Sequence, residues 1–355
     1  NIYKTAEHPF APFVRILGKG KTSSRSLTLD EARQAMAMIL DGEVEDVQLG
    51  AFLMLLRVKE ESPEELAGFV LASRQWLQAR RDRALADAGL ALPAADLDWS
   101  SYAGKRKHYP WFLLAVELLR RHGVRVFMHG AGGHTINRLY TESVLPELGL
   151  PVCTNWPAAA ATLDSHGFAY LALDHLCPPL GDIIGLRNIL GLRSPVHTLA
   201  RLLNPLDAPH VMQAIFHPAY RDSHQQAASL LGYGNSCVIK GEGGEIERNP
   251  DGLCLAQQIV DGTLASEEWP ALFPLRHAPE EAFDLGEVPR DEGLVRGNDA
   301  LAIFEGRHDH VLRIGRAAHD LHGALWHRAL GRKGSSACIR SGPPTHPGVA
   351  ARLSG

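Results

Sequence analysis

Hydrophobic residues recur at helical spacing near the start of the chain. Between residues 32 and 39 they fall on one side of a helix, which is typical of packing against a core. Thr28 and Glu31 form a capping box, in which each side chain accepts a hydrogen bond from the other residue's backbone N–H. The pair Asp41-Gly42 then interrupts the pattern. We therefore predict a helix that begins after Thr28 and ends before Asp41.

Two further helices are predicted downstream. Residues 47–58 are almost continuously apolar, which indicates a helix buried in the core or against a second subunit. Residues 62–65 read Ser-Pro-Glu-Glu, a helix start with a serine cap, a proline in the first turn and acids at the positive end of the helix dipole. The charged run 79–83 is expected to lead out of this helical unit.

From about residue 85 short apolar runs alternate with helical segments. A helix is predicted over 111–121, and residues 178–205 interrupt the alternation with one or two helices. Alternating strands and helices are typical of a parallel sheet in a layered α/β fold. Predicted strands lie at 124–128, 168–173, 211–216 and 237–240, and another is expected just before residue 100.

Composition is that of a globular protein with one large domain or two modest ones. The chain has 355 residues, of which 45% are hydrophobic and 21% charged, so a disordered chain is excluded. No stretch approaches the roughly 20 uninterrupted apolar residues of a membrane helix, and no secretory signal is visible in residues 1–10. The 5 cysteines are odd in number and lack Cys-x-x-Cys spacing, so we expect a reducing, cytoplasmic environment.

Charge is distributed unevenly. The net charge of −4 argues against a uniformly basic nucleic-acid binder. Three segments nevertheless contain basic residues and no acidic ones: 8–29, 100–116 and 183–206. Each segment alone is typical of a solvated face, whereas the three together would form a surface suited to phosphates. The basic residues of the second and third segments are Lys105, Arg106, Lys107, Arg187, Arg193 and Arg201.

Three glycine-containing turns carry candidate chemistry. Residues 18–21 read Gly-Lys-Gly-Lys, which suits a phosphate contact and equally suits a flexible connector. Residues 100–109 lie between a predicted strand and a helix, where N–H groups point toward an anion, and Tyr102 is placed to stack on a base. Residues 128–134 follow the next strand, and His129 or His134 would contact phosphate there. A solvated turn and structural histidines are the alternatives.

Metal and nucleophile motifs are weak. Residues 308–327 contain His-x-His and His-x-x-His spacings, but no carboxylate or cysteine completes a recognised zinc site. No nucleophile–base pair can be identified, so no catalytic residue is assigned.

The order of the motifs resembles the anthranilate phosphoribosyltransferase family, from about residue 13 to 251. LDGEV at 40–44, GAFLM at 50–54 and SPEELAGF at 62–69 resemble its helical N-terminal domain. LRNILGLR at 186–193 with LLNP at 202–205 resembles its helical insertion, and VIKG at 238–241 resembles the strand before its metal-binding loop.

The resemblance implies an α/β fold class: a small all-helical N-terminal domain plus a large α/β domain with a central, mainly parallel sheet, the nucleoside phosphorylase/phosphoribosyltransferase fold. It also implies a homodimer formed through the helical domains. We expect the domain parts at 1–84 with about 175–205, at 85–174 with about 206–330, and an irregular tail at 331–355.

The chemical motifs depart from the enzyme. Its pyrophosphate loop Gly-Thr-Gly-Gly-Asp corresponds to Trp-Ser-Ser-Tyr-Ala-Gly-Lys at 99–105, and its Lys-His-Gly-Asn-Arg to Met-His-Gly-Ala-Gly at 128–132. Its Asp-Glu magnesium pair falls on Ile246 and Glu247, so one carboxylate is missing, and magnesium needs hard oxygen ligands to hold a diphosphate.

These replacements are similar to those of the family's divergent YbiB-type branch, in which the resemblance implies nucleic-acid binding by a basic groove on a homodimer, with little sequence preference. The leading prediction is therefore sequence-nonspecific binding of nucleic acid, preferably single-stranded DNA, with no cofactor or metal. The expected contacts are Lys19, Lys21, Tyr102, Lys105, Arg106, Lys107, Arg193 and Arg201.

Two alternatives remain open from the sequence. The first is an active phosphoribosyltransferase of tryptophan biosynthesis, which would use magnesium and phosphoribosyl diphosphate on anthranilate or another aromatic amine or base. The second is a vestigial fold that senses a small phosphorylated ligand. For the enzyme, the phosphate-binding residues would be Gly104, His129, Gly130 and Gly132, with Glu247 as metal ligand.

Overall fold

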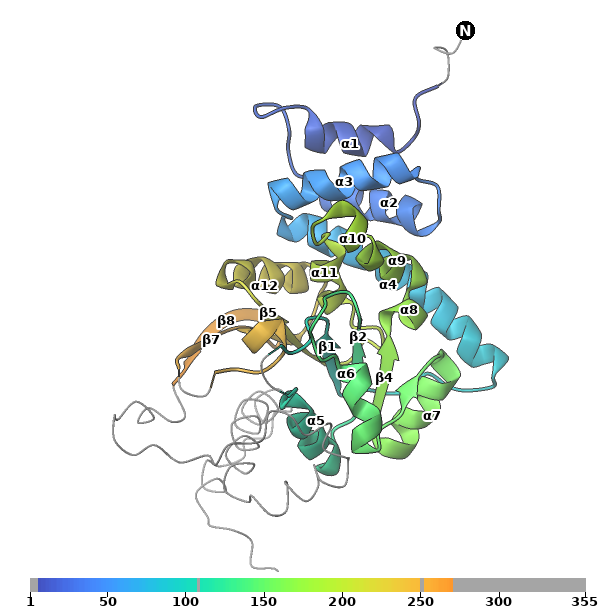
Figure 1. Ribbon diagram of the computed structural model, residues 1–355, viewed down its shortest axis with the longest axis vertical. Helices are drawn as coiled ribbons and strands as arrows, with labels where there is room; N and C mark the ends of the chain where they lie inside the picture. Colours follow the sequence, from blue (N-terminus) through green and yellow to red (C-terminus); the bar gives the residue numbers. More distant parts are fainter. Residues whose placement is uncertain (1–5, 107–108, 250–251, 271–355) are drawn as a thin grey trace, which may run out of the picture.

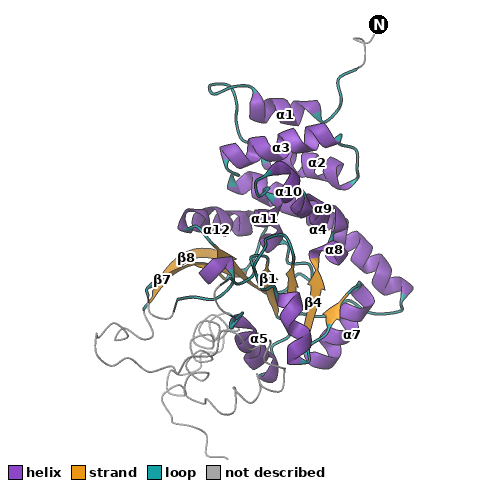
Figure 2. Ribbon diagram, viewed as in Figure 1, coloured by secondary structure: helices purple, strands orange, loops and turns teal. Residues whose placement is uncertain are grey.

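The computed structural model describes residues 6–106, 109–249 and 252–270. A bundle of helices stacks on one end of an α/β domain, and short helices lie between the two (Figure 1 and Figure 2). The four N-terminal helices are α1 (Ala11–Gly18), α2 (Leu29–Leu40), α3 (Asp46–Lys59) and α4 (Pro63–Asp87).

Two predicted helix starts are confirmed. Thr28 caps α2 and Ser62 caps α4, each through a complete capping box with the glutamate three residues later. Glu65 also contacts a second segment, since its Oε1 accepts a hydrogen bond from the Leu27 N–H at 2.7 Å. The start of α4 is thereby tied to the segment that precedes α2.

The prediction that residues 79–83 lead out of the helical unit is wrong, because α4 continues to Asp87. Arg81 is 4% exposed, and its Nη1 donates to the Pro205 carbonyl at 2.5 Å. Gln78 Nε2 donates to Asp207 at 3.0 Å. Gln78 and Arg81 therefore tie this part of α4 to the loop at 204–207, while Arg83 stays exposed.

Within the described residues, eight strands form one sheet in the order β3-β4-β2-β1-β5-β6-β7-β8. The first six in this order are parallel, which confirms the predicted parallel sheet, and β7 and β8 are antiparallel. The strands are β1 (Leu97–Ser101), β2 (Val126–Gly130), β3 (Val152–Cys153), β4 (Phe168–Ala172), β5 (His210–Ile215), β6 (Asn235–Lys240), β7 (Cys254–Val260) and β8 (Thr263–Trp269).

Side chains alternate between two core clusters along the parallel strands. In β2, Phe127 packs in the cluster that continues into the helical bundle, and Val126 and Met128 pack in the opposite one, beside α5 (Phe112–Arg121). The predicted helix over 111–121 is thus confirmed. The face toward the bundle is covered by α7 (Trp156–His166) and α12 (Arg221–Leu230), which both pack against α4.

Short helices follow the carboxyl ends of the strands. The segment 178–205, predicted to hold one or two helices, is broken into four pieces because prolines and glycines interrupt it. These pieces are α9 (Pro178–Gly185), α10 (Arg187–Leu190), α11 (Val196–Leu199) and η2 (Ala200–Leu202). The remaining ones are α6 (Thr141–Val144), η1 (Leu145–Leu148), α8 (Leu173–Leu176), η3 (Pro218–Tyr220) and η4 (Glu242–Gly244).

Candidate functional site: the carboxyl edge of the sheet

Parallel strands bring their carboxyl ends to one edge of the sheet, where ligands bind in open α/β folds. Here that edge faces the helical bundle, and α10 and α11 lie over it (Figure 1). The loops after β1, β2, β5 and β6 meet there, and they contain most of the residues that the sequence singles out.

The loop after β1 already holds an anion from its own chain. The N–H groups of Ala103 and Gly104 both donate to Glu245 Oε1 at 2.7 Å. Two successive N–H groups that converge on one point form an anion-binding turn. Glu245 is 1% exposed, and burial raises the pKa of its carboxyl. A carboxylate from the loop after β6 thus occupies the place that a bound phosphate would need.

Glu247, the predicted metal ligand, is engaged as well. Its Oε1 accepts from Lys105 Nζ at 2.8 Å, and its Oε2 accepts from the Phe112 N–H, at the start of α5, at 3.2 Å. Within the described residues, no group of three or more His, Cys, Asp or Glu side chains is arranged to hold a metal ion. Both oxygens of Glu247 are therefore engaged by groups of the chain itself.

The same ion pair corrects the expectation for Lys105. Its side chain is 2% exposed and its charge is matched by Glu247, so it does not face solvent. The ammonium group also donates to the Glu242 carbonyl at 3.4 Å. Lys105 fixes the loop after β1 against the loop after β6.

Tyr102 is likewise buried, with 1% of its surface exposed. Its hydroxyl lies 2.7 Å from His129 Nδ1, and His129 Nε2 lies 3.1 Å from Asp98 Oδ2. His129 is itself completely buried, so neither side chain contacts an external phosphate or base. The stacking role predicted for Tyr102 is corrected: the Tyr102–His129–Asp98 chain is part of the core.

The glycines of these loops are needed for close packing. A Cβ on Gly130 would lie 2.0 Å from the Ser101 carbonyl oxygen, and one on Gly132 would lie 2.1 Å from Glu142 Oε1. Gly104 has φ +67° and lies against Tyr140, at 2.9 Å from its would-be Cβ. Packing against backbone explains Gly130, and positive φ explains Gly104, whereas the Glu142 side chain beside Gly132 is flexible and could move away.

Four arginines gather over the edge, and we call them the arginine cluster: Arg138, Arg187, Arg193 and Arg201. Arg138 Nη1 donates to the Ala103 carbonyl at 2.9 Å, and Arg201 Nη1 to the His197 carbonyl at 2.9 Å. Arg187 Nη1 donates to the His134 carbonyl at 2.9 Å. Three of the guanidinium groups are therefore positioned by backbone carbonyls, which orient them without neutralising them.

Among the described residues, none of the four forms an ion pair with a carboxylate, and Arg193 has no hydrogen-bond partner. Burial and the charges of the other three arginines lower the pKa of Arg193 to about 10, so it stays protonated at neutral pH. The arginine cluster is thus a partly buried group of positive charges, and the buried Glu245 carboxyl attracts the Arg201 guanidinium.

Two histidines lie beside the arginine cluster, with ring centroids 5.1 Å apart. Burial, with the nearby arginines, lowers the pKa of His134 to about 4 and that of His197 to about 3. Both rings are therefore neutral at pH 7. His134, predicted to contact phosphate, accordingly lies next to the arginine cluster, and its Nε2 is 2.8 Å from the Tyr102 carbonyl.

The other predicted contacts are scattered. Lys19 and Lys21 are exposed on the loop after α1, at the far end of the bundle from the sheet (Figure 1). Arg106 is exposed next to Lys105. Lys107, the histidines between 308 and 327 and the tail at 331–355 lie outside the described residues. Arg193 and Arg201 are thus the predicted nucleic-acid contacts that the fold brings together.

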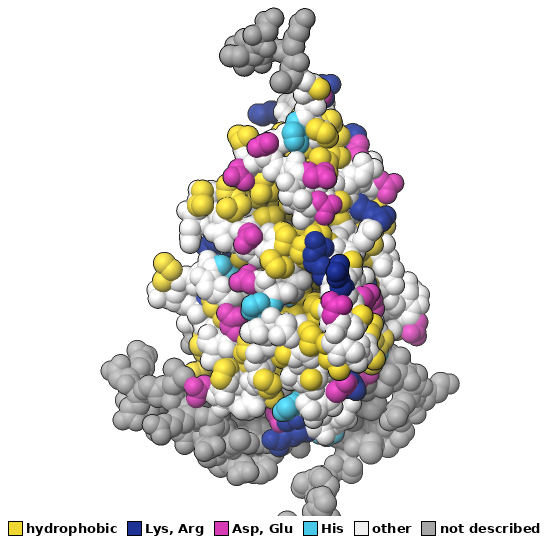
Figure 3. Space-filling model, turned by 90° about the vertical axis from the view of Figure 1, so that its right-hand side faces the viewer, with side chains coloured by type: hydrophobic (Ala, Val, Ile, Leu, Met, Phe, Trp, Pro, Cys, Tyr) yellow, Lys and Arg dark blue, Asp and Glu magenta, His cyan; other side chains and the backbone are white. Residues whose placement is uncertain are grey.

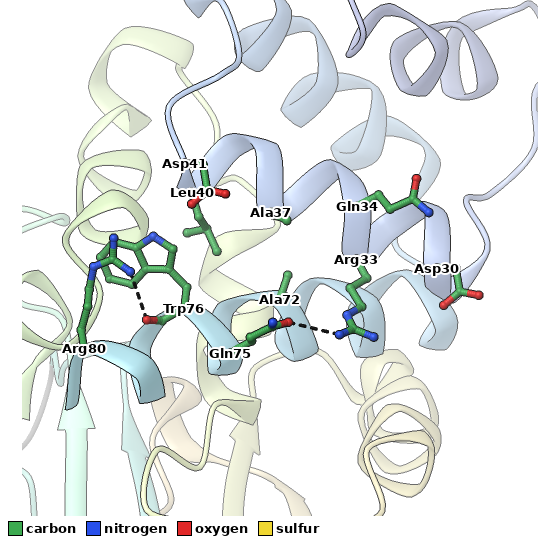
Figure 4. A pocket seen from close by; sticks show the side chains of 10 residues that line it. All are labelled: Asp30, Arg33, Gln34, Ala37, Leu40, Asp41, Ala72, Gln75, Trp76 and Arg80. Carbon is green, nitrogen blue, oxygen red and sulfur yellow. Dashed lines mark hydrogen bonds between the residues drawn. The ribbon is translucent and has the colours of Figure 1, made fainter. Parts of the chain in front are cut away.

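A separate pocket of about 400 Å³ lies between α2 and α4. In Figure 4 the Arg80 guanidinium covers the Trp76 ring, at 3.3 Å from its centroid, and Arg33 reaches Gln75 at 3.1 Å. Asp30 and Asp41 also line it, so its charge is mixed. On the face drawn in Figure 3, acidic and basic side chains are likewise interspersed among the described residues.

Sequence reasoning missed two features of the site. Glu245 was overlooked because the fold alone places it on amides more than 140 residues earlier in the chain. Arg138 was not singled out either, although it joins three loops: its Nη1 also donates to the Gly104 carbonyl at 3.0 Å and to the Gly243 carbonyl at 3.3 Å. No local pattern distinguishes either residue.

Similarity to known proteins agrees with this architecture. Residues 13–76 match the glycosyl transferase family, helical bundle domain. Overall, the chain belongs to glycosyl transferase family 3, the family of anthranilate phosphoribosyltransferases.

Individual relatives fall into two groups. YbiB of Escherichia coli strain K12 is 30% identical over 254 residues, which cover 71% of this chain and 76% of YbiB. The anthranilate phosphoribosyltransferase of Pelotomaculum thermopropionicum is 26% identical over 292 residues, covering 81% of this chain and 80% of the enzyme.

The same fold occurs in the crystal structure of anthranilate phosphoribosyltransferase from Thermus thermophilus. The match has a TM-score of 0.58 and 20% identity, and it covers 74% of this chain and 73% of that one. The expected combination of a helical bundle with a mostly parallel α/β domain is thus confirmed. Of the helices described for this chain, none is both long and apolar enough to cross a membrane.

Proposed function

We propose that this protein binds nucleic acid, preferably single-stranded DNA, by neutralising backbone phosphates with the arginine cluster and with little sequence preference. The observation that carries the proposal is a group of four guanidinium groups without a carboxylate ion pair among the described residues, at the edge where α/β folds bind ligands. Arginine forms planar, paired hydrogen bonds with phosphate oxygens.

The contacts of residues 99–105, which correspond to the enzyme's pyrophosphate loop, favour nucleic acid as the ligand over phosphoribosyl diphosphate. Glu245 accepts hydrogen bonds from the Ala103 and Gly104 N–H groups, and Glu247 forms an ion pair with Lys105. Both carboxylates are therefore already engaged within the chain. Phosphodiesters carry one charge each and are bound through arginine without a metal. The arginine cluster meets that requirement.

The homodimer implied by the resemblance remains part of the proposal. Helices α3 and α10 leave large apolar side chains exposed on the bundle: Val47 at 79%, Val58 at 82% and Ile189 at 81%. Pairing of two bundles would cover such side chains and would give one particle two arginine clusters for one strand.

The test is fluorescence anisotropy of a labelled single-stranded oligonucleotide against salt concentration. We expect a steep negative slope of log affinity against log salt, which Arg193→Ala reduces by about 0.7 for the phosphate contact that is lost. Arg83→Ala is the matched control, because Arg83 is exposed on α4, away from the arginine cluster. It should change neither affinity nor slope.

Two outcomes would oppose the proposal. Absence of binding by the wild-type protein at low salt would remove it. Equal effects of Arg193→Ala and Arg83→Ala would show that binding does not use the arginine cluster.

A further inference from the structure

An exposed aromatic group lies at the same sheet edge, directly after β5. We call it the β5 aromatic patch: Phe216, His217 and Tyr220. Phe216 is 51% exposed, and its ring meets that of His217 edge-on, with centroids 4.8 Å apart. The rings of His217 and Tyr220 follow at 6.3 Å. The patch presents aromatic faces that nothing among the described residues buries completely.

The patch adjoins the arginine cluster at Gly244. A Cβ built on Gly244 would lie 3.7 Å from Arg201 Nη2 and 3.7 Å from Phe216 Cβ. The start of the Phe216 side chain and one guanidinium group therefore flank the same short stretch of the loop after β6.

A further cation lies near the patch. Lys240 ends β6, pairs in register with Ile215, the residue before Phe216, and is exposed. Single-stranded nucleic-acid sites combine such exposed rings with nearby cations, so that bases stack on aromatic side chains and basic groups follow the backbone.

From this juxtaposition we infer that Phe216, supported by His217, is the platform on which this protein stacks an unpaired base next to a phosphate bound by Arg201. The inference rests on the proposed function. It adds the residue that would make the protein bind single strands more tightly than duplexes. A base within a duplex has no free face to offer, whereas arginine–phosphate contacts are available in both forms.

The experiment compares three labelled probes of equal length: oligothymidylate, an oligomer with an abasic spacer at every position, and a duplex. Phe216→Ala should weaken binding of oligothymidylate about 5-fold or more, because one stacked base is lost, and should leave the abasic oligomer and the duplex unchanged. Leu264→Ala is the matched control, since Leu264 on β8 is also 51% exposed. It should have no effect on any probe.

A second variant gives a direct signal. Phe216→Trp should keep the affinity for oligothymidylate, and its fluorescence should be quenched by that probe and not by the abasic oligomer. Equal losses on all three probes with Phe216→Ala, or an unquenched tryptophan in the bound complex, would overturn the inference while leaving the arginine cluster as the binding site. If the wild-type protein binds none of the probes, the proposed function itself fails.

Discussion

A buried carboxylate that satisfies two loop amides changes what those amides do. In the loop after β1, Ala103 and Gly104 donate to Glu245, so the turn stays formed without an external anion. Lys105 and Glu247 add a buried ion pair between the same two loops. At the residue scale, side chains of the chain itself satisfy the amides and the ammonium group of these two loops, while the guanidinium groups of the arginine cluster form no ion pair with a carboxylate among the described residues.

Glu61 provides a pH test at this scale. Burial raises the pKa of its carboxyl to about 7; Glu65 and Glu60 add to the shift, and its own backbone N–H and Arg57 oppose it. Because the folded pKa lies above the unfolded one, the associated stability is present at low pH and is lost as pH rises toward 7. We therefore expect Glu61→Gln to raise the free energy of unfolding at pH 8 by about 1–3 kcal/mol, and by less at pH 5.

Urea unfolding at the two pH values measures this difference. Glu43→Gln is the control, because it removes the same charge from an exposed position in the loop after α2. A gain for Glu61→Gln that is equal at pH 5 and pH 8 would contradict the assigned pKa direction.

At the element scale, the bundle depends on the close crossing of α2 and α4. A Cβ on Gly68 would lie 2.3 Å from the Leu29 carbonyl oxygen and 2.7 Å from Ala32 Cβ. The Leu29 carbonyl belongs to the backbone of α2 and cannot move aside as a flexible side chain can. We therefore expect Gly68→Ala to lower the free energy of unfolding by about 1–3 kcal/mol.

Gly50 in α3 provides the opposite case. The nearest atom to its would-be Cβ is Leu190 Cδ2 at 3.9 Å, so alanine fits. Gly50→Ala should stabilise by about 0.5–1 kcal/mol through lower chain entropy in the unfolded state. Thermal unfolding followed by circular dichroism compares the pair, and a loss for both variants would refute the packing argument.

Elements with strong local signals were predictable. The capping boxes at Thr28 and Ser62 and the apolar runs of β2, β4, β5 and β6 were read correctly, because each is encoded within a few residues. The β7–β8 hairpin was overlooked although Asp261-Gly262, both with positive φ, is a typical hairpin turn. The end of α4 was misread because its charged residues bind a loop more than 120 residues away.

The site was less predictable than the fold, since it depends on pairings between distant segments. The segment 183–206 contains arginines and no acidic residue, and three of the four members of the arginine cluster come from it. Nothing local indicates that Glu247 neutralises Lys105 or that Tyr102 is buried. The acid-free segments predict positive charge at the sheet edge, but the contacts between distant segments determine which of these charges form ion pairs.

At the scale of the whole molecule, binding should follow the arginine cluster and not the net charge. The chain carries −4 at pH 7 and 18 histidines, so it becomes more negative as pH rises from 6 to 8.5. Arg193 and the two histidines beside the arginine cluster keep their charge states in that range, because the pKa of Arg193 is about 10 and those of His134 and His197 are about 4 and about 3. We therefore expect the affinity for single-stranded oligonucleotide, at constant ionic strength, to change by less than about 3-fold between pH 6 and 8.5. Anisotropy titrations across this range measure it, with Arg193→Ala as the variant that should be weaker at every pH. A fall of tenfold or more in step with the rising negative charge would instead assign binding to the overall field of the protein.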